Sequence, residues 1–127
     1  MLAVATGIQA SDFVVDELCY NITDAEAKTV EVAKYDYTVD GEMVRPTKMD
    51  VVVPMTVVNP NDNQTYRVTA LGDGAFTVYG LRGGWFDYTS IVLPEGLLEI
   101  KANAFSGQSK LTSLVIPGTV KSVKTKF

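Results

Sequence analysis

The sequence predicts a mainly β fold with little helix, in which an N-terminal β-hairpin and strand cap precedes a short solenoid of about three coils. Three observations support this fold class. One motif recurs at an offset of 23, a proline closes each strand-like run of the motif, and the first third of the chain alternates apolar and polar residues between turn signals. Because 127 residues suffice for one domain, we expect a single continuous domain over residues 11–127.

Residues 1–10 are apolar or small and carry no charged side chain. Such a run before a polar pair is typical of the end of a secretory signal peptide, whose basic start would lie upstream of Met1. A flexible or strand-forming N-terminus is the alternative. The signal-like segment predicts a secreted or cell-surface protein. No run approaches the roughly 20 apolar residues of a spanning helix, so we expect no membrane insertion.

Residues 11–47 are expected to form the β cap. Residues 29–33 and 34–39 alternate as half-buried strands do, and the Asp-Gly pair at 40–41 is a turn signal. Residues 24–27 allow one helical turn at most. A cap of this kind covers the end of the solenoid core and hides the edge of the first coil.

A repeated motif occupies the second half of the chain. Residues 88–94 (Tyr-Thr-Ser-Ile-Val-Leu-Pro) match residues 111–117 (Leu-Thr-Ser-Leu-Val-Ile-Pro) at an offset of 23. A fainter copy, Val-Val-Val-Pro at residues 51–54, precedes the first at an offset of 40, which is one period plus an insertion of 17. Aliphatic residues follow the two later prolines three and six positions on, at Leu97 and Ile100 and at Val120 and Val123.

The inserted part of the chain divides into two segments. About eleven of its residues fall between Val57 and Val68, where residues 59–64 (Asn-Pro-Asn-Asp-Asn-Gln) give a turn signal between two strand-like runs. About six fall between Phe76 and Tyr88. The oxygen-bearing side chains of residues 59–64 lack the spacing of a calcium loop, so we expect a hairpin turn there and no metal site.

A repeat of this length with aliphatics at fixed offsets is the pattern of a solenoid coil. Ordering the backbone costs about 1–2 kcal/mol per residue, more than the few inward side chains of one coil return, so each coil needs neighbours that share its core. Alternation predicts that Leu111, Leu114 and Ile116 point inward and that Ser113 and Val115 point outward. Each proline is expected where a short strand ends, because proline cannot donate to a ladder.

These repeats resemble the BspA-type leucine-rich repeats of bacterial surface proteins. Residues 91–105 and 111–123 follow that family's coil pattern, L-T-S-[IVL]-x-I-P-x-x-V-x-x-I-x-x-x-A-F. Residues 13–22 resemble the β-hairpin that opens such proteins, and residues 51–76 resemble the irregular first coil. Gln108 departs from the pattern, because the family often has a cysteine there. The resemblance implies a leucine-rich-repeat solenoid over residues 48–127.

The resemblance also implies a function. It points to an exported, non-catalytic, adhesin-like surface protein that binds a protein or a glycan on host or microbial surfaces. The outward strand positions would form a ladder on one face, and solenoids use such faces for binding. Residues 79–88 depart from the repeat and are rich in the residue types of interface hot spots, with packing over the coil as the alternative role. The candidate contacts are Tyr79, Arg82, Trp85, Tyr88, Thr89, Ser90, Val92, Thr112, Ser113 and Val115.

The composition disfavours catalysis and nucleic-acid binding. The chain has no histidine, and 15 acidic residues against 11 basic ones leave a net charge of −4. Cys19 is the only cysteine and alternates into the cap sheet, so we expect a buried structural thiol. We therefore expect no catalytic residue, no cofactor and no metal. A hydrolase that uses Asp/Glu pairs is the least supported alternative, because no spacing places two carboxylates on a common face.

The alternative function is that of a structural cap or truncated fragment of a larger repeat protein. Its last coil is incomplete and would leave unpaired backbone beside the apolar Val120, Val123 and Phe127. This open C-terminal edge would mediate self-association into a homo-oligomer.

Overall fold

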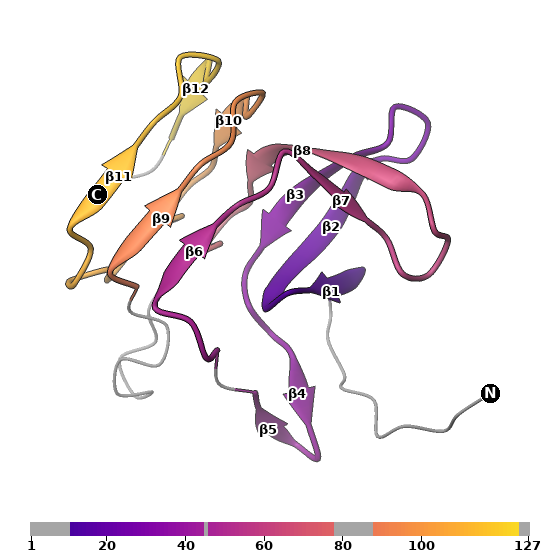
Figure 1. Cartoon of the computed structure of the whole chain (residues 1–127), viewed down its shortest axis with the longest axis horizontal. Coiled ribbons are helices and arrows are strands. Elements are labelled where there is room, and N and C mark those ends of the chain that lie inside the picture. Colours follow the sequence, from indigo (N-terminus) through magenta and orange to yellow (C-terminus); the bar gives the residue numbers. More distant parts are fainter. Residues whose placement is uncertain (1–10, 45, 78–87, 125–127) are drawn as a thin grey trace.

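The computed structural model describes residues 11–44, 46–77 and 88–124, and every regular element in these ranges is a β-strand (Figure 1). The signal-like segment, residues 1–10, lies outside these ranges. No helix of the described residues is long and apolar enough to cross a membrane. The strands are β1 (Phe13–Val15), β2 (Leu18–Asp24), β3 (Thr29–Ala33), β4 (Thr38–Val39), β5 (Glu42–Met43), β6 (Asp50–Val52), β7 (Thr56–Val58), β8 (Thr65–Leu71), β9 (Ser90–Val92), β10 (Glu99–Ile100), β11 (Ser113–Val115) and β12 (Ser122–Val123).

The N-terminal hairpin pairs β1 with β2 in antiparallel register. Its two turn residues, Asp16 and Glu17, both have positive φ (49° and 66°), as the tightest two-residue hairpin turns require. Strand β2 then pairs with β3, whose bounds match the predicted run at residues 29–33. The Asp-Gly turn at residues 40–41 is also confirmed, between β4 and β5.

The predicted strand over residues 34–39 is mostly wrong, because only Thr38 and Val39 are in a strand. A side-chain contact anchors the part of this segment that precedes β4. The backbone N–H and the hydroxyl of Ser11 both donate to the Asp36 carboxylate, at 3.0 Å each. The chain therefore leaves the main sheet after β3 and forms a separate two-stranded sheet.

The solenoid has two parallel sides, with β6, β9 and β11 on one side and β8, β10 and β12 on the other (Figure 1). On one side, β6, β9 and β11 pair in register, with Asp50 opposite Ser90 and Ser90 opposite Ser113. On the other side, β8, β10 and β12 pair, with Ala70 opposite Glu99 and Glu99 opposite Ser122. The pairs that join the last two coils have an offset of 23 on both sides, as predicted.

The two insertions lie where the sequence places them. The pairs that join the first two coils have an offset of 40 on the β6 side and of 29 on the β8 side, and the difference of 11 corresponds to the β7–β8 hairpin. The Phe76 N–H donates to the Ala104 carbonyl at 2.7 Å and the Phe76 ring stacks on that of Phe105, so the offset of 29 still holds at Phe76. At Ser90 the offset is 23, which places the second insertion between Phe76 and Tyr88.

One hydrophobic core runs through the cap and the coils. Parallel pairing of β3 with β8 joins the cap to the second side of the solenoid in one continuous sheet. The predicted boundary between cap and solenoid, at residues 47 and 48, therefore does not separate two sheets and stays a prediction. Leu71, Leu97 and Ile100 are fully buried at the centre of the coils. Strands β6, β9 and β11 each end two residues before a proline, which confirms the prediction that a proline follows the end of each short strand.

The last coil is less buried than predicted at one position. Leu111 and Leu114 pack half-buried against the core, and Ser113 and Val115 point outward, as expected. Ile116, however, is 38% exposed, whereas Leu93 and Val53 at the equivalent positions of the inner coils are buried. Among the described residues, the coil that holds Ile116 has a neighbouring coil on one side only, so its strand end is less covered than that of the inner coils.

Candidate functional site

An exposed valine ladder crosses the outer face of β6, β9 and β11. Val52, Val92 and Val115 lie opposite one another in register and are 68%, 51% and 73% exposed. The intervening residues of the same strands, among them Ile91, point into the core. The ladder follows from the period of two along each strand, which sends one side chain inward and its two neighbours outward.

A polar row borders the valine ladder. The hydroxyls of Thr89 and Ser90 each donate to Asp50 Oδ1 at 2.9 Å. These two hydrogen bonds, first that of Ser90 and then that of Thr89, hold the pKa of the Asp50 carboxyl below its usual value. The Thr112 hydroxyl continues the row by donating to the Thr89 carbonyl at 3.0 Å. The face therefore combines apolar side chains with an ionised carboxylate held by hydroxyls.

The ladder side of β9 and β11 also contains a shallow cavity of about 180 Å³. Its wall combines apolar side chains with the Glu95 side chain, which is exposed. The lining residues are Ile91, Val92, Leu93, Glu95, Ser113, Val115 and Pro117. A partner that covers the valine ladder would also reach this hollow.

The structure places six of the predicted contact residues along this side of the solenoid. They are Thr89, Ser90, Val92, Thr112, Ser113 and Val115. Sequence reasoning missed Asp50 and Val52, because the first copy lacks the Thr-Ser pair. The alignment of the Val-Val-Val-Pro copy with the later motifs carried enough information to find them.

In the described part of the chain, none of the predicted contact residues of the insertion, residues 79–88, is found on this face. Tyr79, Arg82 and Trp85 lie outside the described residues. Tyr88 is buried, and its ring meets the Phe76 ring edge-on with centroids 5.7 Å apart. The Tyr88 side chain therefore belongs to the core and is not available to a partner.

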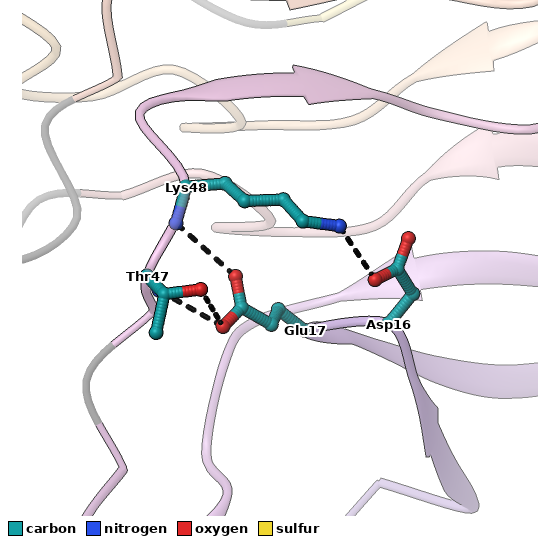
Figure 2. Close-up of polar contacts among 4 residues, drawn as sticks. All are labelled: Asp16, Glu17, Thr47 and Lys48. Atoms are coloured by element: carbon teal, nitrogen blue, oxygen red, sulfur yellow. Dashed lines mark hydrogen bonds and ion pairs between the residues drawn. The ribbon is translucent and has the colours of Figure 1, made fainter.

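The cap hairpin is fastened to the segment before β6 by its turn carboxylates (Figure 2). One Glu17 oxygen accepts from the Thr47 N–H at 2.9 Å and from the Thr47 hydroxyl at 2.7 Å, and the other accepts from the Lys48 N–H at 3.3 Å. The Lys48 ammonium reaches Asp16 at 2.7 Å. These contacts position the cap beside the first strand of the ladder.

Gln108 joins the two ends of the insertion. Its amide N–H₂ donates to the Phe76 carbonyl at 2.7 Å, and its amide oxygen accepts from the Tyr88 N–H at 2.9 Å. This residue, which departs from the family pattern, thus satisfies one backbone group on each side of residues 78–87. The sequence signals only that the position is unusual.

Gln108→Met is expected to lower the free energy of unfolding by about 1–3 kcal/mol, because two part-buried backbone groups lose a hydrogen-bond partner while the side-chain length is kept. Urea unfolding followed by circular dichroism measures the change. Gln64→Met, at an exposed position of the β7–β8 turn, serves as the control and should change the value by less than about 0.5 kcal/mol. Equal losses in both variants would contradict a joining role for Gln108.

The buried cysteine has a structural role, as predicted. Cys19 is buried in a small cluster with Tyr35, and burial raises the pKa of its thiol to about 11, so the thiol stays protonated at neutral pH.

In the β7–β8 turn, the Asn59 side chain accepts from the Asn61 N–H and the Asp62 side chain accepts from the Tyr66 hydroxyl. The predicted hairpin turn is confirmed. Within the described ranges, no group of three or more His, Cys, Asp or Glu residues is arranged to hold a metal ion.

Solved structures resemble this chain. A leucine-rich repeat protein from Bacteroides ovatus ATCC 8483 superposes with a TM-score of 0.64 and is 34% identical over 87% of this chain. The chain therefore has the fold of a leucine-rich repeat protein. The predicted resemblance to leucine-rich repeat proteins and the mainly β solenoid are confirmed.

This leucine-rich repeat chain spans 24% of the length of the Bacteroides ovatus protein. A second leucine-rich repeat protein, from Bacteroides capillosus ATCC 29799, has a TM-score of 0.49 and 18% identity, with coverage of 94% of this chain and 65% of that one. A scan against protein-family models finds no match, and a search of curated proteins finds none either.

Proposed function

We propose that this leucine-rich repeat chain is a non-catalytic, secreted or cell-surface binding module that holds a protein or a glycan of host or microbial surfaces, in the manner of an adhesin. The binding surface is the outer face of β6, β9 and β11. The observation that carries the proposal is the valine ladder, in which three aligned apolar side chains remain more than half exposed. Aligned exposed apolar residues with a polar border are typical of interaction surfaces.

The face has the features that recognition needs. Covering the three valines removes apolar surface from water, which is the main favourable term in association. The polar row of Asp50, Thr89 and Thr112 adds directional hydrogen-bonding groups beside the ladder. Their spacing is fixed by strand pairing, so a partner meets a preformed surface and little ordering cost arises on binding.

The test is binding of the folded chain to a panel of immobilised extracellular-matrix proteins and surface glycans. For a panel member that binds, the double variant with Val92→Ser and Val115→Ser is expected to weaken the interaction about tenfold or more, because the apolar centre of the contact is lost. Val123→Ser, which removes an exposed valine from the other side of the solenoid, should leave binding unchanged. The absence of any binding above background, or equal binding by both variants, would contradict the proposal.

The second candidate function is self-association through the C-terminal edge. Among the described residues, β11 pairs only with β9 and β12 only with β10, so each presents one edge without a strand partner. Val123 is exposed on this edge, Val120 packs half-buried against the core, and Phe127 lies outside the described residues. Static light scattering discriminates this candidate: a monomer at high concentration would refute it.

A further inference from the structure

A groove separates the cap hairpin from the first coil. Its volume is about 380 Å³. Apolar side chains line it from both sides, with Val15, Leu18 and Tyr20 on the hairpin and Pro54, Val57 and Val58 on the coil. Val58 is half exposed, so part of this apolar lining is open to solvent. In Figure 1, the lining strands β1, β2 and β7 lie on the side of β6 that faces away from β9.

Two of the strands that line the groove are sheet edges. Within the described part of the chain, β1 pairs only with β2, and β7 pairs only with β8. An extended segment in the groove can therefore pair its backbone with one of these strands, while its alternate side chains enter the apolar lining.

The polar end of the groove is acidic. A neighbouring cavity of about 160 Å³ shares Asp16 and Val52 with the apolar part. Three carboxylates line this end, those of Asp16, Glu17 and Asp50, against the single described ammonium of Lys48. The Lys48–Asp16 ion pair is exposed on both sides, so an incoming cation can replace Lys48 at little cost. The charge of the groove thus favours a basic occupant.

We propose that this groove binds an extended segment of another protein in which apolar and basic side chains alternate. Its apolar side chains pack against Val15, Pro54 and Val58, and a basic side chain meets Asp50 and Glu17 at the acidic end. Val52 lines the groove and also belongs to the valine ladder, so the two surfaces adjoin at β6. The groove adds an apolar lining on the hairpin and on β7 that the ladder does not include.

The probe is a fluorescein-labelled peptide, Val-Lys-Val-Lys-Val-Tyr, measured by fluorescence anisotropy on the full chain. The matched peptide carries glutamate at both lysine positions. We expect the lysine peptide to bind about tenfold or more tightly than the glutamate peptide, and its affinity to fall as salt is raised. Equal affinities would overturn the proposal.

Variants locate the peptide. Val58→Glu is expected to weaken binding about tenfold, because it places a charge in the apolar lining. Asp50→Asn, which keeps the acceptor for Thr89 and Ser90, should weaken it about threefold by removing one negative charge. Glu26→Gln, at an exposed site of the β2–β3 turn, is the control for charge and should have no effect.

A further control separates the groove from the valine ladder. Val115→Glu changes an exposed valine of the ladder and should leave peptide binding intact. If Val115→Glu weakens binding as much as Val58→Glu, the peptide binds to the ladder and the groove proposal fails. Self-association that Val58→Glu abolishes would identify a second copy of this chain as the occupant and would likewise overturn the proposal. Circular dichroism of each variant confirms that the fold is retained.

Discussion

Leu97→Ala is expected to lower the free energy of unfolding by about 3 kcal/mol, within the usual range for a buried leucine. Leu97 is 0% exposed. It lies in the same hydrophobic core as Leu71 and Ile100, and neighbouring coils share this core. Removal of its side chain leaves a cavity that the paired strands around it cannot close without breaking register. Urea unfolding followed by circular dichroism gives the change in the free energy of unfolding.

The adjacent residue is the matched control, because Leu98 has the same side chain but is 43% exposed. Leu98→Ala should cost less than about 1 kcal/mol. Its backbone position is one residue away, so the chemical change and the local chain segment are the same in the two variants. If both substitutions cost the same, the interior of the coils would not be the shared core that the solenoid requires.

The period of the solenoid could be predicted because alternation leaves little freedom of register. Shifting a strand by one residue would turn Ile91 and Leu114 outward and Val92 and Val115 inward. In β11 and the residue after it, the aliphatic side chains at 114 and 116 both fit the inward pattern, yet Ile116 is exposed. Which side chains of an outer coil are covered depends on the neighbouring coil, and a single strand's sequence does not contain that information.

The contacts of the cap could not be predicted in the same way. Glu17 reaches Thr47 across 30 residues, and no periodic pattern links the two positions. Ser11 meets Asp36 across 25 residues in the same manner. Such side-chain contacts follow from where the cap sheet meets the first coil, which is a property of the folded chain. For the same reason the groove beside Asp50 has no signal in the sequence, although the valine ladder does.

Phe76→Ala is expected to lower the free energy of unfolding by about 4 kcal/mol, the cost of a large aromatic side chain removed from a core. The Phe76 ring is buried and stacks on Phe105 of the next coil, with centroids 6.0 Å apart and planes 11° apart. The Tyr88 ring also contacts it, at an angle of 88° between the ring planes. One ring therefore joins two coils and the end of the insertion, and its loss should be visible as a lower midpoint in urea.

A double-mutant cycle with Phe105→Ala tests whether the stacked rings act together. Because each ring loses its partner in either single variant, the double variant should lose about 0.5–1.5 kcal/mol less than the sum of the two single losses. Phe76→Leu, which keeps most of the volume without the ring, should cost less than Phe76→Ala. Strict additivity would show that the recurring Ala-Phe pair stabilises each coil separately. A coupling of the expected size would show instead that this aromatic layer makes neighbouring coils depend on one another.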